Sequence, residues 1–412
     1  MRTIRPVLFW THLVAGVISG VVVLIMSVTG VLLTYQKQMT LWADLRGVEA
    51  GPPTPNAERL TPDSLLSLVA ARESAGQTKT PTNVVWRYGA TMPVEVQFGR
   101  EGRQYLSAYT GEVVGTGSVL MRKVFQVSTD WHRWLAMKDD SRATGKLVTG
   151  VSNLAFLVLV LTGMVLWWPR NLTWKATKQV LVFRRGLSAK ARDFNWHNVI
   201  GIWSAIPLAA VVASATVISF PWASDLVYRV VGEEPPARAE APAPAPAVGT
   251  ANRGSASGGS EGRGSEGRGS ETAKPGAPLV GDVYALAAQR MPDWRSMSLA
   301  WPKAADAPLV YSIDRGMGGE PHKRATLTIS RTGDAPKWAV FGDQSVGRRA
   351  RSIMRFTHTG EVLGFWGQTI AGLVSLGGAV LVYTGLALSL RRFVAWRRRA
   401  ASAAPVAAEV TA

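Results

Sequence analysis

The chain of 412 residues contains no cysteine. This absence excludes thiolate metal sites, iron–sulfur clusters and thiol catalysis, and it fits an oxidising compartment that the chain enters without disulfide bonds. Acidic residues are also scarce, because 28 Asp and Glu face 46 Lys and Arg and leave a net charge of +18. Charged residues of either sign are missing from four apolar runs, residues 13–35, 147–168, 199–222 and 365–390. Each run reaches the roughly 20 residues that a helix needs to cross a bilayer, so we expect four transmembrane helices.

The run at residues 13–35 follows Arg2 and Arg5, as the core of a signal peptide would. It is longer than a usual signal core and no clean small-residue cleavage site ends it, so we expect a retained anchor.

Lys and Arg near helix ends predict the orientation, because they favour the cytoplasmic side. Fourteen basic and two acidic residues lie in the N-terminus, the loop 170–196 and the tail 391–412. Both termini are therefore predicted to be cytoplasmic, the lipid bilayer is an expected partner, and nucleic acid is not.

Two long segments, 36–130 and 225–355, are predicted to form small α+β units outside the cytoplasm. The expected elements are helices at 61–77 and 280–290 and strands at 84–88, 94–98, 105–109, 309–313 and 325–329. The phrase Tyr-Leu-Ser-Ala-Tyr-Thr-Gly-Glu at 105–112 is echoed by Leu-Thr-Ile-Ser-Arg-Thr-Gly-Asp at 327–334. A Pro/Ala and then Gly/Ser/Arg/Glu tract at 233–278 cannot bury a core, so it is predicted to be a disordered linker.

The histidines indicate an internal repeat. Four of the five, His12, His132, His197 and His358, lie at or near the ends of the four apolar runs. His12 and His132 are 120 positions apart and His197 and His358 are 161 apart, and the excess of 41 is close to the length of the linker. Without the linker, the chain is two copies of helix, unit and helix that both begin in the cytoplasm. We expect the copies to be parallel and related by a pseudo-two-fold axis along the membrane normal.

The predicted fold class is a membrane all-α core of four helices, made of two parallel helix–unit–helix repeats, with two small extracytoplasmic α+β domains. The predicted boundaries are 1–35 for the N-terminus and first helix, 36–130 for the first unit, 131–169 for the second helix and the segment before it, 170–196 for the basic loop, 197–224 for the third helix, 225–355 for the second unit with its linker, 356–390 for the fourth helix and 391–412 for the tail.

The repeat pairs His12 with His197 near the cytoplasmic surface and His132 with His358 near the opposite surface. A planar cofactor on the axis would receive one imidazole from each copy, so we expect two b-type haems with these histidines as axial ligands. A single interfacial histidine is more often a neutral hydrogen-bonded residue, but four matching positions favour ligation. Zinc is a weaker alternative because no cysteine or carboxylate pair completes four ligands, and copper has no methionine cluster to support it. His322 has no counterpart and is expected to be surface.

Small residues accompany the histidines. Gly16 and Gly201 each follow a histidine by one turn, where a porphyrin edge needs room, although such glycines equally serve helix packing. Thr-Gly pairs at 29–30, 162–163 and 384–385 recur late in three helices. We interpret them as packing positions, with a place beside the cofactors as the alternative.

Five arginines lie close in sequence to His132 or His358, the pair predicted near the non-cytoplasmic surface: Arg133, Arg348, Arg349, Arg351 and Arg355. The positive-inside rule does not explain them, because they are predicted on the other face. Arg133 and Arg355 are assigned to the haem carboxylates, and Arg348, Arg349 and Arg351 to an anionic substrate. An amphipathic helix on anionic lipid is the alternative. For a cytoplasmic-side haem, Arg5, Lys190 and Arg192 are available.

Four segments carry a resemblance to a known family: Trp-His-Arg-Trp-Leu at 131–135, Leu-Thr-Gly-Met-Val-Leu-Trp-Trp-Pro-Arg at 161–170, Trp-His-Asn-Val-Ile-Gly at 196–201 and Phe-Thr-His-Thr-Gly-Glu-Val-Leu-Gly at 356–364. Over nearly its whole length, apart from the linker and tail, the chain resembles PepSY-associated transmembrane proteins, which include iron-regulated ferric-siderophore reductases. The resemblance implies a di-haem protein of the bacterial inner membrane with PepSY-like periplasmic domains, which reduces ferric iron in the periplasm and so releases it from its chelator. The long linker departs from the family's compact pattern and leaves the substrate class open.

The expected function is therefore transmembrane reduction of a ferric siderophore or another ferric chelate, with a cytoplasmic or quinol electron donor. The haems carry this chemistry, so no catalytic acid or base is expected. The sequence has no Gly-rich dinucleotide fingerprint, so NADPH or flavin would act through a partner. Two alternatives remain, a sensory or inhibitory PepSY module without redox activity and a metal or siderophore permease. A permease typically has ionisable groups deep in its helices, and the centres of these helices have none.

Overall fold

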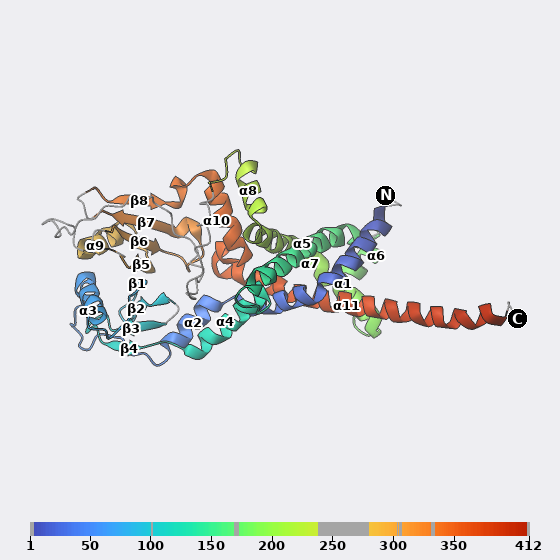
Figure 1. The fold of residues 1–412 in the computed structure, drawn as a ribbon, viewed down its shortest axis with the longest axis horizontal. Coiled ribbons are helices and arrows are strands. Elements are labelled where there is room, and N and C mark those ends of the chain that lie inside the picture. The colour runs from blue at the N-terminus through green and yellow to red at the C-terminus, as the bar shows by residue number, and fades with distance from the viewer. Residues whose placement is uncertain are drawn as a thin grey trace.

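A computed structural model of the chain describes residues 4–99, 102–168, 173–237, 280–302, 304, 307–330 and 334–409. The predicted disordered linker at 233–278 lies outside the described residues except for its first five. The molecule is elongated, with a sheet-bearing head at one end and long helices at the other (Figure 1). Both termini lie at the end away from the head, which we call the terminal end.

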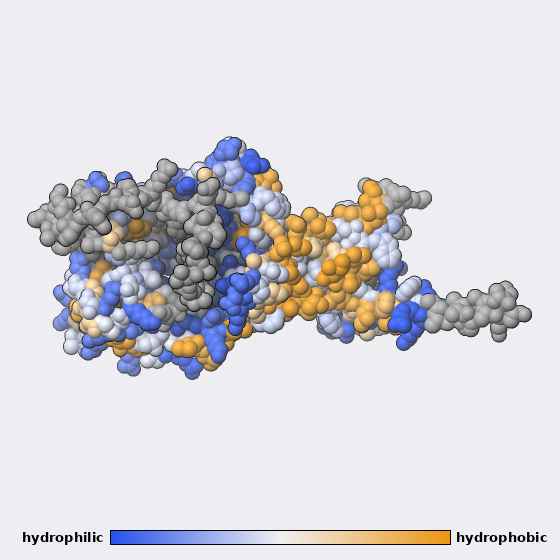
Figure 2. Space-filling model, viewed as in Figure 1, coloured by the Kyte–Doolittle hydropathy of each residue, from blue (hydrophilic) through white to orange (hydrophobic). Residues whose placement is uncertain are grey.

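Four helices in the described part of the chain are long and apolar enough to cross a membrane. They are α1 (Ile4–Leu33), α5 (Ser141–Trp167), α7 (Ala189–Ser219) and α11 (Gly364–Glu409). Apolar surface covers this part of the molecule, between the polar head and a hydrophilic patch near the C-terminus (Figure 2). The third helix begins before the expected residue 197, and the fourth continues through the expected tail, because Ala and Arg after residue 390 are good helix formers.

The four helices form a bundle in which α1 and α7 each pack against both α5 and α11. Helices α1 and α7 therefore occupy opposite corners. The bundle is held by an apolar core of Val23, Phe156, Val160, Leu208, Val212, Val374 and Val382. Small residues let the helices approach closely, since a β-carbon on Gly20 would stand 3.0 Å from the side chain of Leu386.

The head contains one antiparallel eight-stranded sheet with the order β4-β3-β2-β1-β5-β6-β7-β8. Its strands are β1 (Asn83–Arg87), β2 (Val94–Gln97), β3 (Arg103–Leu106), β4 (Val113–Gly115), β5 (Ser296–Ala300), β6 (Leu309–Asp314), β7 (Arg324–Ile329) and β8 (Lys337–Val340). The two segments predicted as separate units are therefore joined edge to edge, through β1 and β5, with Val85 opposite Ser298. The echoed phrases begin in β3 and β7, which hold matching places on either side of this central pair.

One face of the sheet carries the apolar core of the head. Side chains alternate along each strand, so Met297, Leu299, Tyr311 and Ile313 point to one face and are fully buried. Helices α3 (Pro62–Ser74) and α9 (Val280–Arg290) cover this face. Helix α3 begins with Pro62 at its first position, and Thr61 caps it by accepting a hydrogen bond from the Ser64 backbone.

Shorter helices connect the bundle to the head and close its ends. They are α2 (Gln36–Leu45), α4 (Val119–Trp134), α6 (Trp174–Leu181), α8 (Pro221–Val230), α10 (Val346–His358) and the single turns η2 (Pro321–Lys323), η3 (Phe341–Asp343) and η4 (Glu361–Leu363). Helices α4 and α10 each end where the chain reverses into a membrane-crossing helix, α5 or α11. Sequence patterning did not predict these short helices as separate elements, because they are amphipathic pieces next to long apolar runs.

Both reversals depend on close backbone approaches that only glycine permits. A β-carbon on Gly145 would stand 2.2 Å from the Trp134 carbonyl oxygen, and one on Gly360 would stand 2.2 Å from the Gly367 carbonyl oxygen. Gly360 also has a φ of 72°, in the left-handed region that favours glycine. The glycines therefore hold the ends of α4 and α10 against the bundle.

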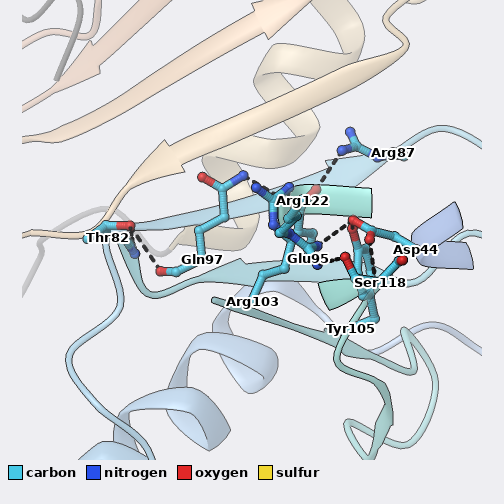
Figure 3. Close-up of polar contacts among 10 residues, drawn as sticks. Asp44, Thr82, Arg87, Glu95, Gln97, Arg103, Tyr105, Ser118 and Arg122 are labelled. Atoms are coloured by element: carbon cyan, nitrogen blue, oxygen red, sulfur yellow. Dashed lines mark hydrogen bonds and ion pairs between the residues drawn. The ribbon is translucent and has the colours of Figure 1, made fainter. Parts of the chain in front are cut away.

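One buried carboxylate, Asp44, attaches α2 and α4 to the sheet, and a second, Glu95, links three neighbouring strands (Figure 3). Asp44 on α2 accepts hydrogen bonds from the Tyr105 hydroxyl at 2.7 Å and the Ser118 backbone at 2.7 Å, and it pairs with Arg122 on α4 at 2.5 Å. The fully buried Glu95 on β2 pairs with Arg87 and Arg103, both at 2.5 Å. A buried carboxylate is stable only with such partners, and the Asp44 contacts fix where α4 leaves the head.

Candidate functional site

His12 on α1 and His197 on α7 face each other near the terminal end of the bundle. Their ring centroids are 6.3 Å apart and the ring planes are inclined by 82°. The Nδ1 atom of His12 lies 2.9 Å from the Thr162 hydroxyl on α5, and that of His197 lies 2.9 Å from the Thr384 hydroxyl on α11. All four long helices thus contribute to this pair.

His132 and His358 form a second pair at the head end, on helices α4 and α10 rather than on the long helices. Their ring centroids are 6.1 Å apart and the planes are inclined by 44°. The Nδ1 atom of His132 lies 3.0 Å from the Thr29 hydroxyl on α1, and that of His358 lies 3.1 Å from the Val211 carbonyl oxygen on α7. Burial, with a smaller effect of the neighbouring His358, lowers the pKa of His132 to about 4. His132 is therefore neutral, the form that binds metals.

The two pairs lie at opposite ends of the bundle. His12 and Thr29 are on the same helix, α1, and the 17 residues between their positions correspond to about 25 Å of helix axis. Thr29 contacts the head-end pair, whereas His12 belongs to the terminal-end pair. The pairing expected from the repeat, His12 with His197 and His132 with His358, is the pairing that the structure brings together.

The hydrogen bonds assign the ring tautomers. Each threonine donates its hydroxyl proton to a carbonyl four residues earlier in its own helix: Thr29 to Ile25 at 2.6 Å, Thr162 to Val158 at 2.7 Å and Thr384 to Val380 at 2.8 Å. The hydroxyl oxygen is then left to accept, so the histidine Nδ1–H must donate. The Val211 carbonyl can only accept, and it requires the same of His358. In all four rings the proton is thus on Nδ1, and the Nε2 lone pair is available.

No hydrogen bond to Nε2 of any of these four rings is found among the described residues. A ring that donates Nδ1–H to a fixed acceptor and leaves Nε2 free has the arrangement of a metal-ligating histidine with its outer-shell partner. Each pair offers two such nitrogens, and within the described parts of the chain no group of three or more His, Cys, Asp or Glu side chains is placed to hold a metal ion.

The glycines after the three threonines also contact the histidines. A β-carbon on Gly30, Gly163 or Gly385 would stand 3.4 Å from Cε1 of His132, His12 or His197, respectively. A side chain larger than a methyl group there would compete with the ring for its position. The Thr-Gly pairs, interpreted from sequence mainly as packing positions, are therefore the direct supports of three histidines.

The fourth histidine is supported differently. Ser214 follows His197 by 17 positions, as Thr29 follows His12. Its hydroxyl donates at 2.8 Å to the Val211 carbonyl, the same oxygen that accepts from His358. Sequence reasoning missed this support, because every residue has a carbonyl and only the close approach of α10 to α7 selects this one.

The arginines assigned from sequence do not gather at one place. Burial and the charges of Arg142 and Arg355 lower the pKa of Arg133, which places Arg133 and Arg355 near each other at the head-end pair. Arg351 instead donates to the Ser224 hydroxyl on α8 at 2.8 Å. Arg348 lines a cavity of about 460 Å³ together with Glu233 and Glu234, and the charge of Arg349 also acts on Glu233. Arg348, Arg349 and Arg351 thus lie near polar or acidic side chains of α8 and the segment after it.

The remaining predicted residues are placed as follows. His322 is exposed in η2. A β-carbon on Gly16 or Gly201 would meet one leucine methyl group at 3.6 or 3.7 Å, which is ordinary contact. At the terminal end, Arg5 donates to the Trp168 carbonyl at 2.7 Å and Arg192 pairs with Asp193, while Lys190 is exposed.

The family model of the PepSY-associated TM region matches residues 9–392. The chain belongs to this family. The match includes both histidine pairs and the Thr-Gly pairs that support them, so the geometry described above lies within the PepSY-associated TM region. No curated protein matches the chain. The chain is therefore a PepSY-associated membrane protein with four candidate transmembrane helices and an antiparallel sheet in its head.

Proposed function

We propose that this protein is a di-haem electron-transfer protein that reduces a ferric siderophore or another ferric chelate at the face of the membrane that carries the head. The two histidine pairs are the observation that carries the proposal. The ring centroids of the two pairs are 6.3 and 6.1 Å apart, and each Nδ1 is held by a fixed acceptor. Haem bound there would supply a one-electron carrier, whose potential depends on axial ligation and burial.

The spacing of the rings supports one metal ion within each pair. A metal–imidazole bond is about 2 Å long, and the ring centroid lies about 1 Å beyond the ligating nitrogen, so two axial rings have centroids about 6 Å apart. The measured separations are 6.3 and 6.1 Å. Haem provides its own four equatorial nitrogens, so a site with only two protein ligands suits it, whereas a closed zinc site needs four.

The internal repeat proposed from the sequence would explain why each histidine pair combines one residue from each half of the chain. Two parallel copies of helix, unit and helix would be related by an axis along the bundle, and each pair takes one histidine from each copy. The symmetrical strand order and the matching supports of His12 and His197 agree with two copies. The basic segments at the terminal end support an orientation with both termini in the cytoplasm of a bacterial inner membrane and the PepSY-like head in the periplasm.

The residues near the head-end pair favour this end as the exit for electrons. Arg133 and Arg355 provide positive charge beside His132 and His358, suited to haem carboxylates or to an anionic ferric complex. Arg133 also lies over the ring of Trp134, 4.6 Å from its centroid, which holds its side chain at the membrane surface. Arg348, Arg349 and Arg351 remain candidate substrate residues, but their protein neighbours reduce the charge that they offer.

The proposal is tested with the purified protein from a haem-sufficient host. A pyridine haemochrome assay should give two haems per chain, and a reduced-minus-oxidised spectrum should be that of six-coordinate b-type haem. The anaerobically reduced protein, mixed with ferric siderophores, should be reoxidised while a ferrous trap binds the released iron. Reoxidation by oxygen or quinones but by no ferric chelate would refute the reductase assignment and leave a respiratory or sensory haem protein. Absence of haem would refute both assignments.

A further inference from the structure

A second cavity lies at the terminal end of the bundle, beside the loop between α6 and α7. Its volume is about 550 Å³. Apolar side chains form most of its wall, namely Phe183 and Leu187 from the loop, Trp196 and Ile200 from α7 and Val380 from α11. Three arginines complete the lining: Arg184, Arg185 and Arg192. The cavity therefore combines an apolar surface with a cluster of positive charge.

The loop that carries two of these arginines is held firmly on α7. The buried Asn195 donates from Nδ2 to the carbonyls of Gln179 at 2.9 Å and Val182 at 3.1 Å, and its Oδ1 accepts from the Arg184 backbone at 3.1 Å. Trp203 donates to the Leu181 carbonyl at 3.0 Å. The cavity is therefore part of the fold, with its arginines on a constrained turn.

The positive charge of the cavity is only partly neutralised by the protein. Arg192 pairs with Asp193, which also pairs with Arg391 of α11 at 2.6 Å. Among the described residues, no acidic side chain pairs with Arg184 or Arg185. Two guanidinium groups in an apolar setting thus favour an anionic partner that brings its own apolar part.

The position of the cavity indicates where that partner comes from. Its wall includes Trp196 and Ile200 in the first half of α7 and Val380 in the middle of the candidate membrane span of α11. Trp203, one turn further along α7, is 71% exposed, and Phe183 packs edge-on against Trp196 with ring centroids 6.3 Å apart. Aromatic and basic residues together are typical of the membrane surface, and basic pockets between transmembrane helices bind anionic lipid headgroups.

We propose that this cavity binds an anionic phospholipid from the leaflet at the terminal end, with the phosphate against Arg184 and Arg185 and an acyl chain along Ile200 and Val380. The proposal does not depend on the proposed haem function. A quinol is the main competing occupant. Its oxidation releases protons, but among the described residues no imidazole or carboxylate lines the cavity, and Asp193, the partner of the lining Arg192, is also paired with Arg391. The arginines instead suit a phosphate.

The test compares lipid retention by the full-length protein in neutral detergent, using native mass spectrometry after addition of phosphatidylglycerol or phosphatidylcholine. We expect selective retention of phosphatidylglycerol. The double variant Arg184→Gln/Arg185→Gln should lower its affinity about 25-fold, since each arginine facing an anionic headgroup contributes about fivefold. Arg397→Gln/Arg398→Gln removes equal charge from the same side and should change affinity less than twofold.

Several results would overturn the proposal. Equal retention of the two lipids would exclude selectivity, and an equal loss in the control variant would show diffuse attraction to the basic surface. Displacement of the lipid by millimolar inorganic phosphate would indicate a free-anion site. Displacement by a short-chain quinone would indicate a quinol site. If the double variant is poorly folded, Arg184→Lys/Arg185→Lys should restore both folding and selectivity; folding without selectivity would contradict the assignment. Haem content is measured in parallel, and its absence would leave the lipid result intact.

Discussion

At the scale of residues, the proposed haem binding depends on which ring nitrogen of each histidine carries the proton. Three threonines donate their hydroxyl protons to backbone carbonyls. Each hydroxyl oxygen can then only accept a hydrogen bond from the histidine, so the histidine must carry its proton on Nδ1. With His358, whose Nδ1 faces the Val211 carbonyl, each pair then offers two unprotonated Nε2 atoms. A histidine in an apolar helix does not reveal this by itself, since a neutral imidazole can hold its proton on either nitrogen.

The first prediction is that the two proposed haems are separable by residue. His12→Ala or His197→Ala should remove the terminal-end haem and leave the other, and His132→Ala or His358→Ala should do the reverse, because His12 is paired with His197 and His132 with His358 at opposite ends of the bundle. Visible spectra and haem content of the four variants provide the measurement. His322→Ala is the control and should leave the spectrum unchanged. Loss of the same spectral component in His12→Ala and His132→Ala would show that the axial pairs are wrong.

The second prediction concerns the outer-shell acceptors. Thr29→Val keeps the shape of the side chain and removes the acceptor for His132, so the head-end haem should bind about 10- to 100-fold more weakly. Thr162→Val should weaken the terminal-end haem in the same way, through His12. Haem retention during dilution, followed by absorbance, measures this loss. Thr34→Val is the matched control, because within the described parts of the chain its hydroxyl bonds only the Gly30 carbonyl. An unchanged affinity in Thr29→Val would remove the threonine from the site.

At the scale of elements, the head-end histidines depend on two short helices, whereas the terminal-end pair belongs to the long ones. Helix α4 is fixed by Asp44 at its start and by Gly145 near its end. Thr149 adds a hydrogen bond to the Arg133 carbonyl at 2.9 Å. Changes in the packing of α4 or α10 can therefore displace the head-end histidines while the bundle of long helices stays intact.

The third prediction follows from the closest of these contacts. In Gly145→Ala the new β-carbon would stand 2.2 Å from the Trp134 carbonyl oxygen, so the end of α4 must move. We expect a loss of about 1–3 kcal/mol in stability, as for other overpacked sites, and a selective loss of the head-end haem. Thermal unfolding and the haem spectrum measure the two effects. Gly342→Ala, where a β-carbon meets nothing within 4 Å, should behave as the native protein. Equal loss of both haems would argue against a local displacement of His132.

At the scale of the whole molecule, the head is one continuous sheet built from two distant parts of the chain. The β1–β5 pairing joins them, and apolar residues from both parts form one core. The shared sheet therefore connects the two halves of the chain outside the helix bundle. The two segments that the sequence predicted as separate units thus share one unbroken sheet.

The fourth prediction is that the linker is dispensable. Residues 240–274 have no counterpart in the first half and lie outside the described residues, and their composition cannot bury a core. Replacement by a short Gly/Ser connector should therefore leave haem content and the unfolding temperature unchanged. Expression level, absorbance and thermal unfolding of the shortened chain provide the check. A large loss of folded protein would show that the tract packs or binds something.

The sequence by itself determined the four membrane-crossing helices, the two pairs of histidines and most strands, because apolar length, residue spacing and alternation are local signals. Only the tertiary structure decided that the two units share one sheet, that His132 and His358 stand on short helices, and that the Thr-Gly pairs and the Val211 carbonyl hold the rings. These features depend on contacts between residues far apart in the chain, such as Val85 with Ser298 and His358 with Val211. Strand edges and carbonyl groups occur throughout the chain, so packing alone selects which of them meet.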